Sequence, residues 1–279
     1  MCPLDAVMQN KTFFFTDIHG HYPLFRAIMN WCGKNTIIYG GDAADRGKNG
    51  YQIIKELVDA SNVIYLYGNH EQLFVQAADA IIGAYSNNKL INNGQVLSQM
   101  RSQEQVQLHI YNGGENTLKD WLLDQANLDI INKLRFLPRT YSYKNLDFCH
   151  AGSTYSMFKE GSKKPLPQYV ETALIWDRNC IPMGWEKDRI GVFGHTPTIH
   201  LPAKVYGRDK SLANIHPCMW GELLGGKNKR GGYKIDMDTG AYGSNRAFVL
   251  DCDTLQTYCF EYNEKTKQIT ITEYELKRP

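Results

Sequence analysis

Short apolar runs alternate with amphipathic stretches in the N-terminal part of the chain. Three of these runs are predicted to be β-strands, namely Thr12–Thr16, Thr36–Tyr39 and Asn62–Tyr67. Apolar residues recur at helical spacing after each run, which predicts helices at Tyr22–Trp31, Tyr51–Ala60 and Glu71–Tyr85. This alternation is typical of a parallel β-sheet that is covered by helices.

The pattern weakens after Tyr85 and then returns as strands. Residues 86–138 are rich in Gln, Asn and Gly, and only Leu118–Leu128 is predicted to be a helix, so we expect an inserted, partly helical cap region. The stretch Tyr141–Cys149 has strand character again. Five further strands are predicted at Ile190–Phe193, Tyr233–Met237, Ala247–Asp251, Thr257–Tyr262 and Ile269–Tyr274. The last two enclose Asn263–Gln268 and are expected to form a hairpin.

Composition limits the architecture and the partners. A chain of 279 residues, 43% of them hydrophobic, can bury the core of one large α/β domain, so residues 1–279 are expected to form a single domain. The net charge of +2 gives no reason to expect membrane binding or a nucleic-acid surface. The Gly- and Lys-rich stretch Gly221–Gly232 is expected to be a loop, and its basic residues Lys227–Arg230 to be solvated.

The cysteines and the N-terminus indicate a cytoplasmic protein. The seven cysteines include no Cys-x-x-Cys pair, so neither a zinc knuckle nor a disulfide framework is expected. Met1–Lys11 has no apolar stretch long enough for a secretory signal, and no apolar run approaches the length of a membrane span.

Five short polar clusters each follow directly after a predicted strand. They are Asp17-Ile18-His19-Gly20, Gly41-Asp42-Ala43-Ala44-Asp45-Arg46-Gly47, Gly68-Asn69-His70-Glu71, His150-Ala151-Gly152 and Gly194-His195-Thr196-Pro197. Because the carboxyl ends of strands in an open α/β sheet face one crevice, we expect the clusters to meet at the edge of a single sheet. Aspartate, asparagine and histidine suit borderline to hard divalent ions. Two Asp, one Asn and three His are more ligands than one tetrahedral ion can bind. They fit two ions that share a carboxylate.

In this order the clusters resemble the phosphoprotein phosphatase family, within the calcineurin-like metallophosphoesterase superfamily. Bacterial and phage-type serine/threonine phosphatases and dinucleoside tetraphosphatase-like members are the most similar. The resemblance covers about residues 12–252, with 86–138 unmatched. It implies an α/β/β/α sandwich of mixed β-sheets flanked by helices, and hydrolysis of phosphate esters by a metal-activated hydroxide.

The resemblance also implies a role for individual residues. Asp17 and His19 would hold a first metal ion and Asp42 would bridge both ions. The second ion would be held by Asn69, His150 and His195. Mn²⁺ is the expected metal, with Fe, Zn, Ni or Co as alternatives.

Four further residues would act on the substrate. His70 would be the general acid that protonates the leaving oxygen, oriented by Asp45. Arg46 would bind phosphate oxygens through its guanidinium group. Arg178 is our choice for a second phosphate-binding arginine, although Arg189 lies close behind it in the sequence.

The chain departs from the family pattern at several positions. Thr16 replaces the glycine that usually precedes the first aspartate. Ala151 occupies a position where eukaryotic protein phosphatases usually have glycine. Tyr67 occupies one where they often have arginine. A Ser-Ala-Pro-Asn-Tyr-Cys segment is also missing, so a eukaryotic holoenzyme subunit is not expected. Asp236–Gly240 resembles an Asp-Thr-Gly stretch of the bacterial branch and is expected to support the site from behind.

Simpler explanations exist for each residue taken alone. An isolated Asp-x-His is usually a turn, Asn69 could be a helix N-cap, and Arg46 could pair with Asp45. Arg178 could form a surface salt bridge. Cys149, beside His150, could suggest a Cys/His nucleophile, but its place at the end of an apolar strand favours a buried thiol.

The sequence leaves the substrate open. Phosphoserine and phosphothreonine, or phosphomonoesters in general, are our expectation, so the partner would be a phosphorylated protein or a small phosphate or nucleotide. A bis(5′-nucleosyl)-tetraphosphate (Ap4A) hydrolase and a 2′,3′-cyclic nucleotide phosphodiesterase are the alternatives. A non-catalytic binding protein with the same fold is an alternative of another class, although every expected ligand position is filled.

Overall fold

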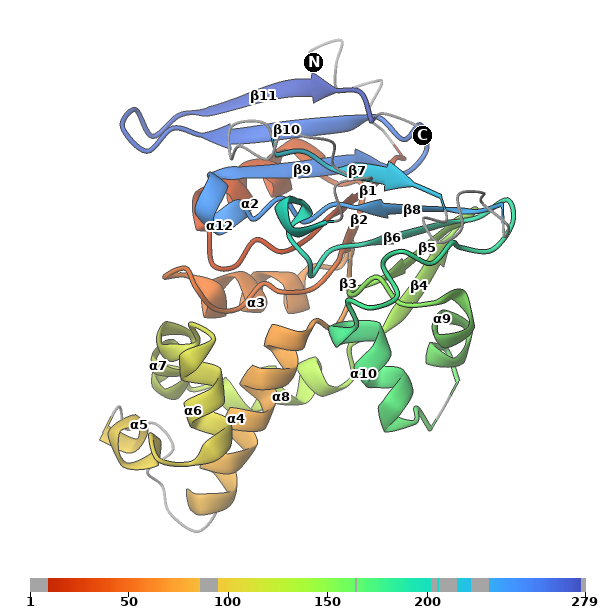
Figure 1. Ribbon diagram of the computed structural model, residues 1–279. Helices are drawn as coiled ribbons and strands as arrows, with labels where there is room; N and C mark the ends of the chain where they lie inside the picture. Colours follow the sequence, from red (N-terminus) through yellow and green to blue (C-terminus); the bar gives the residue numbers. More distant parts are fainter. Residues whose placement is uncertain are drawn as a thin grey trace.

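Two β-sheets pack face to face at the centre of the computed structural model (Figure 1). The structure describes residues 10–85, 95–163, 165–201, 205, 215–221 and 231–276. The interpretation of Lys227–Arg230 as a solvated loop, and most of the loop predicted at Gly221–Gly232, lie outside these residues.

The first sheet has six strands in the order β11-β10-β9-β1-β2-β3. Its parallel half, which contains the three N-terminal strands of the sequence prediction, consists of β1 (Thr12–Phe15), β2 (Thr36–Tyr39) and β3 (Val63–Tyr65). The antiparallel half consists of β9 (Arg246–Asp251), β10 (Thr257–Tyr262) and β11 (Ile269–Tyr274). The predicted hairpin around Asn263–Gln268 is therefore confirmed.

The second sheet has five strands in the order β4-β5-β6-β8-β7. Its strands are β4 (Thr140–Tyr143), β5 (Leu146–Cys149), β6 (Ile190–Phe193), β7 (Cys218–Trp220) and β8 (Tyr233–Asp236). β5, β6 and β8 run parallel to one another, while β4 and β7 run antiparallel at the two edges. Both sheets are therefore mixed.

Alternate residues of β1 face different layers. Phe14 points between the two sheets, where it packs in one core with Phe148 and Val192 of the second sheet. Phe13 and Phe15 belong to the core on the opposite face, beneath helices α2 (Tyr22–Cys32) and α3 (Gly50–Asp59). Burial on both faces explains why Phe13–Phe15 are all apolar.

The remaining helices lie along the edges of the sandwich. The insert and the helix before it form a bundle of α4 (Asn69–Tyr85), α5 (Gln95–Met100), α6 (Glu104–Tyr111), α7 (Glu115–Leu123) and α8 (Asn127–Arg135), drawn at the lower left of Figure 1. Within this bundle α6 packs against α4. From the bundle, α7 packs against α3. The short helical segments that follow include α9 (Tyr155–Gly161), α10 (Gln168–Trp176), η2 (Thr198–His200) and α12 (Ala241–Ser244).

The predicted α/β/β/α class with a partly helical insert is confirmed, but two predicted elements are wrong. Leu118–Leu128 is not one helix, because Asp124 is extended and its carboxylate accepts a hydrogen bond from the Ala126 amide at 3.0 Å. Tyr141–Cys149 is not one strand but a hairpin, β4–β5, whose turn contains Lys144 with a φ of 54°. Among the helices that the structure describes, none combines the length and hydropathy needed to cross a bilayer.

Candidate metal centre

The polar clusters converge where parallel strands of both sheets end. Asp17 and His19 follow β1, Asp42 follows β2, and Asn69 begins α4 after β3. From the second sheet, His150 follows β5 and His195 follows β6. The expectation that the clusters meet at the edge of a single sheet is therefore wrong, since the site lies between two sheets. The carboxyl ends of the parallel strands still position it.

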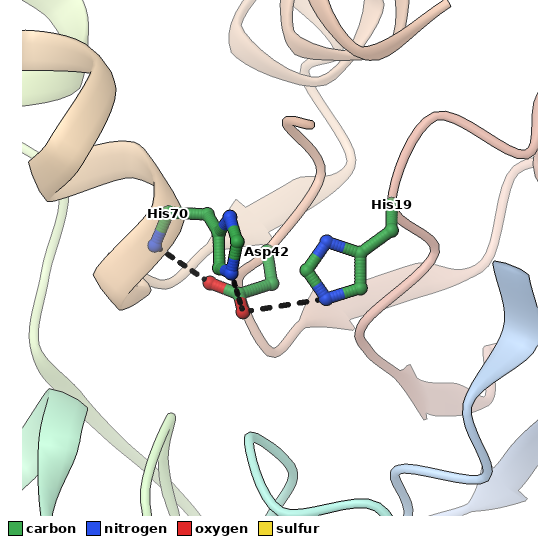
Figure 2. A group of neighbouring side chains, drawn as sticks. All are labelled: His19, Asp42 and His70. Carbon is green, nitrogen blue, oxygen red and sulfur yellow. Dashed lines mark hydrogen bonds and ion pairs between the residues drawn. The ribbon is translucent and has the colours of Figure 1, made fainter. Parts of the chain in front are cut away.

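Asp42 lies at the middle of the cluster. Its Oδ2 is 3.5 Å from His19 Nε2, and its Oδ1 is 3.2 Å from His150 Nε2. Figure 2 shows His19 and His70 on either side of this carboxylate, with the His70 backbone N–H donating to Oδ1 at 3.0 Å. Two groups of potential ligands share Asp42, namely His19, Asp42 and His70, and Asp42, His150 and His195.

Asn69 joins the two histidines of the second sheet. Its Oδ1 lies 2.9 Å from His150 Nε2 and 2.8 Å from His195 Nδ1. Helix α4 begins at Asn69 itself, and the Gly68 carbonyl accepts the first helical hydrogen bond, from Gln72. Gly68 is therefore in the N-cap position, and the Asn69 side chain points into the site.

Backbone carbonyls fix the orientation of three histidine rings. His19 Nδ1 is 2.9 Å from the Ala44 carbonyl, and His150 Nδ1 is 2.8 Å from the Gly40 carbonyl. His195 Nε2 is 3.2 Å from the Trp176 carbonyl. A carbonyl only accepts, so each of these nitrogens carries a proton, and the second nitrogen of each ring faces the site, where it can bind a metal ion once it is unprotonated.

A buried donor atom supports the fit of a metal ion. His19 Nε2 is buried and has no hydrogen-bond partner within the described residues. Buried polar atoms are normally satisfied, so an orphaned imidazole nitrogen beside a carboxylate is best explained as a ligand position. The donor set of imidazole, carboxylate and amide oxygens fits borderline divalent ions.

Asp17 lies at the edge of this cluster. Its Oδ1 is 3.9 Å from His19 Nε2, and its carboxylate accepts from the His195 backbone N–H at 3.2 and 3.1 Å. Thr16 Oγ1 donates to Asp17 Oδ2 at 2.6 Å. The threonine that replaces the family's usual glycine therefore holds the carboxylate in place, a contact that the sequence did not indicate.

Burial and charge shift the pKa values in opposite directions. Burial raises the pKa of Asp42, but His150, His70 and His19 outweigh it and hold this pKa well below its usual range. Burial lowers the pKa of His150, but Asp42 then raises it to about 10. Burial raises the pKa of Asp17 well above its usual range. Protonation of these groups is therefore coupled, and a cation bound beside the Asp42 carboxylate would compete with the protons on His150 and Asp17.

A second cluster adjoins the first. His70 Nδ1 lies 2.7 Å from Asp45 Oδ2, and both side chains are buried. His70 Nε2 faces the site, 3.8 Å from Asp42 Oδ2 and 3.3 Å from Arg46 Nη2. Burial lowers the pKa of His70, but Asp42 and Asp45 together raise it above its usual value. The ring is therefore suited to carry a proton.

A pocket of about 500 Å³ opens beside His195 and both proposed arginines. Thr196 and Pro197 of the fifth cluster also line it, together with three residues that the sequence did not single out, Ile181, Pro182 and His200. Arg178 Nη2 is 3.4 Å from the His195 carbonyl oxygen, so this arginine borders the site. Arg189 is instead paired with the buried carboxylate of Asp147. The choice of Arg178 over Arg189 agrees with this geometry.

Glu71 is a further residue whose role the sequence did not reveal. Its buried carboxylate accepts from the backbone N–H groups of Asp42 and Ala43, both at 2.8 Å, and of Gly68 at 2.9 Å. The Tyr65 hydroxyl also donates to it, at 2.8 Å. Glu71 thus ties the loop that carries Asp42 to the start of α4. The only hint of this role in the sequence was an acidic residue in the first turn of a mostly apolar helix.

The backbone is strained where the clusters lie. Six non-glycine residues adopt φ angles between 45° and 72°, namely Asp17, His19, Asp42, Asp45, Arg46 and His195. Such conformations cost about 1–3 kcal/mol each and persist where the surroundings hold them, as they do at functional sites.

Two other interpretations concern residues around the site. Cys149 is buried, and burial raises the pKa of its thiol to about 12, so the buried-thiol interpretation is confirmed. Asp236 and Asp238 are buried as well, and the Asp238 carbonyl accepts from the Thr198 N–H at 2.8 Å. The Asp236–Gly240 stretch thus packs behind the pocket-lining loop.

Comparisons with known proteins agree with this arrangement. A family model described as calcineurin-like phosphoesterase matches residues 11–213. No curated protein sequence matches the chain.

Solved structures match most of the chain at low sequence identity. A candidate diadenosine tetraphosphatase is 13% identical, with 95% of this chain and 94% of that chain covered and a TM-score of 0.43. A metallophosphoesterase from Sphaerobacter thermophilus is 16% identical, with 96% and 89% covered and a TM-score of 0.43. A cold-active protein-tyrosine phosphatase of a psychrophilic Shewanella species is 14% identical, with 95% and 80% covered and a TM-score of 0.47.

Proposed function

Since the chain belongs to the calcineurin-like phosphoesterase family, we propose that it is a dinuclear metal-dependent phosphatase that hydrolyses phosphomonoesters, including phosphoserine and phosphothreonine. One observation carries the proposal: two groups of potential ligands share the Asp42 carboxylate. A shared carboxylate is the usual means of holding two divalent ions close enough to act on one phosphate.

The proposed ligands come from loops that follow strands of both sheets. Asp17 and His19 would hold one ion, and Asn69 of the first sheet with His150 and His195 of the second would hold the other, with Asp42 common to both. When bound, the ions would activate a water molecule and neutralise charge on the phosphoryl oxygens. Mn²⁺ is our first choice of metal. His70 is within reach of the first ion as well, and its contact with Asp45 is our reason for giving it another role.

Arg46 and Arg178 are proposed to hold the phosphate. Both line the pocket beside His195, and both are exposed, so their guanidinium groups can reach a ligand. Guanidinium groups bind phosphate oxygens through paired hydrogen bonds and remain charged throughout the physiological range. Arg46 Nη2 also lies 3.3 Å from His70 Nε2, so a phosphate bound by Arg46 would lie beside the proposed proton donor.

His70 is proposed to protonate the leaving oxygen. Asp45 accepts from Nδ1 and keeps the ring protonated and oriented, so Nε2 carries the proton that is transferred. Departure of a serine or threonine alkoxide requires such a donor, because the alkoxide is a poor leaving group. The pocket beyond Arg178 would receive the remainder of the substrate.

The test is hydrolysis by Mn²⁺-loaded protein of three substrates: a phosphoserine peptide, Ap4A and a 2′,3′-cyclic nucleotide. We expect the phosphopeptide to be hydrolysed with the highest kcat/KM, and activity to be lost on chelation and restored by Mn²⁺. Faster hydrolysis of Ap4A or the cyclic nucleotide would reassign the substrate class. No hydrolysis of any of the three would indicate a non-catalytic binding protein.

We also propose a cytoplasmic location. All six cysteines in the described part of the chain are free thiols, five of them buried. This usage is typical of a reducing compartment. Secretion with formation of disulfides would contradict it.

A further inference from the structure

The helical insert reaches back to the loop that carries Asp45 and Arg46. The segment from His109 at the end of α6 to Thr117 in α7, here the 109–117 segment, lies directly against these two residues. Arg46 donates its backbone N–H to the Gly113 carbonyl at 3.0 Å. The insert is far from this loop in sequence, and neither composition nor spacing predicted the contact.

Thr117 makes two hydrogen bonds to the same aspartate. Its hydroxyl donates to Asp45 Oδ1 at 3.0 Å and accepts from the Asp45 backbone N–H at 3.1 Å. Thr117 and Asp45 are both fully buried. One hydroxyl therefore fixes the carboxylate relative to its own backbone. The other carboxylate oxygen, Oδ2, is left for His70 Nδ1 at 2.7 Å.

His109 adds a second contact on the same carboxylate oxygen. Its Nε2 lies 3.3 Å from Asp45 Oδ1, a packing contact without a hydrogen bond, and the ring is fully buried. The ring stacks on Phe74, with centroids 5.6 Å apart and an interplanar angle of 26°. A Cβ on Gly114 would come within 2.1 Å of the imidazole, so glycine at this position makes room for the ring.

Gly113 allows the equally close approach to Arg46. Its φ of 94° suits glycine, and a Cβ there would lie 2.9 Å from the Arg46 backbone nitrogen. Asp45 and Arg46 themselves have φ angles of 72° and 59°, a conformation that the surroundings must maintain. The 109–117 segment supplies backbone and side-chain contacts to both residues.

We propose that the 109–117 segment is the positioning element of the general acid, with Thr117 as its principal residue and His109 as its support. By holding Asp45, Thr117 fixes the ring of His70 so that Nε2 faces the leaving oxygen. The inference rests on the proposed phosphatase function. It makes the insert part of the catalytic unit rather than a cap that only contacts substrate.

The kinetic test compares substrates that differ in their need for an acid. In Thr117→Val, which keeps the shape and removes the hydroxyl, we expect kcat for phosphoserine to fall about 10- to 100-fold. For p-nitrophenyl phosphate, whose leaving group needs little protonation, we expect a change of less than about threefold. Thr117→Ser keeps the hydroxyl and should restore most of the phosphoserine activity.

A matched control separates positioning from loss of stability. Val106 is buried on α6, as His109 is, but carries no polar atom. Val106→Ala should lower stability and leave the ratio of the two activities unchanged. In a His70→Ala background, Thr117→Val should have no further effect on phosphoserine turnover, because the residue through which it acts is absent.

A spectroscopic readout tests the inference independently of turnover. In zinc-loaded, full-length protein with ¹⁵N-labelled histidine, the His70 Nδ1–H should give a protected low-field proton signal in the wild type and in Thr117→Ser. The signal should be broadened or lost in Thr117→Val. If the wild type hydrolyses no substrate, the proposed function fails, and this signal still decides whether Thr117 orders His70.

Two results would overturn the inference. One is equal loss of activity on both substrates in Thr117→Val, which would show a merely structural role. The other is an unchanged His70 signal in that variant.

Discussion

At the scale of single residues, each of the three histidines proposed as ligands uses one ring nitrogen for orientation and presents the other to the site. The partners are the carbonyls of Ala44 and Gly40, in the loop after β2, and of Trp176, at the end of α10. His70 differs, because its inner partner is the carboxylate of Asp45. This difference in partner is the physical basis for separating ligands from the proton donor.

His70→Ala should therefore separate metal binding from catalysis. We expect the variant to retain its metal ions, because other residues hold them. Turnover of phosphoserine should fall about 10²- to 10⁴-fold, and turnover of p-nitrophenyl phosphate far less. Metal analysis of the purified variant together with kinetics on both esters checks this. Equal slowing of both esters would contradict the role as general acid, and loss of one ion would make His70 a ligand.

Metal binding should release protons, and its affinity should rise with pH. The pKa of His150 is raised to about 10, so in the neutral range the metal-free ring is protonated and must lose that proton to bind an ion. The raised pKa of Asp17 adds competition from protons as the pH falls. The pKa values of His19 and His195 are well below their usual value, so these rings are neutral and release no proton.

Titration calorimetry with Mn²⁺ in two buffers of different ionisation enthalpy measures this release. His150→Gln is the matched variant and should release fewer protons. An affinity independent of pH between about 6 and 8 would contradict the proposed ligand set.

The ligand positions could be predicted from residue types that follow strands, since Asp, Asn and His after a glycine-rich turn have few other uses together. Thr16, Glu71 and Thr117 could not, because a threonine or glutamate has many ordinary structural roles. Their function follows from hydrogen bonds to Asp17, the Asp42 loop and Asp45, which only the packed chain reveals.

At the scale of elements, glycines at strand ends let the two sheets approach each other. Gly194 follows β6 of the second sheet, and a Cβ there would lie 2.0 Å from Asp17 Oδ2, beyond β1 of the first sheet. A Cβ on Gly40, after β2, would lie 2.5 Å from Thr16 Oγ1. The site therefore has no room for side chains at these positions.

Gly194→Ala should displace Asp17 and weaken metal binding. We expect at least a tenfold loss of Mn²⁺ affinity by calorimetry and a parallel loss of activity, on the scale of other disturbances around ligands. Gly83→Ala is the matched control, because it lies in helix α4 where a Cβ meets nothing within 4 Å. Alanine there should raise stability by about 0.5–1 kcal/mol without affecting metal. Unchanged Mn²⁺ affinity in Gly194→Ala would show that the contact with Asp17 is not needed.

Elements with a strong period were predictable, and turns inside apolar segments were not. β2 and β6 begin and end at the predicted residues, because glycine and polar residues flank their apolar runs. The hairpin of β4 and β5 was predicted as one strand, since the turn at Lys144 and Asn145 carries no glycine or proline. The break at Asp124 was missed because its cause, an aspartate accepting from the Ala126 N–H, is a local hydrogen bond rather than a change in hydrophobic pattern.

At the scale of the whole molecule, the site joins the two sheets of the sandwich. Potential ligands come from loops of both sheets, so bound ions would link two layers that otherwise meet through an apolar core. The fold class followed from the order of the clusters, while the division of ligands between two sheets depends on strand pairing, which the sequence pattern did not specify.

Metal binding should therefore stabilise the fold. At a free Mn²⁺ concentration 100 times the Kd, one ion contributes about 2.7 kcal/mol to the free energy of unfolding. For a protein of this size we expect Tm to rise by about 5–10 °C relative to chelated protein. Differential scanning calorimetry measures the shift, and Asp42→Ala should show little of it. An identical Tm with and without Mn²⁺ would contradict the proposed link between the sheets.

The most direct measurement is anomalous scattering from crystals of the Mn²⁺-loaded protein, recorded at the manganese edge. We expect two peaks about 3.5–4 Å apart, on either side of the Asp42 carboxylate. One should be bounded by Asp17 and His19, and the other by Asn69, His150 and His195. A single peak, or peaks away from Asp42, would contradict a dinuclear site between the two sheets.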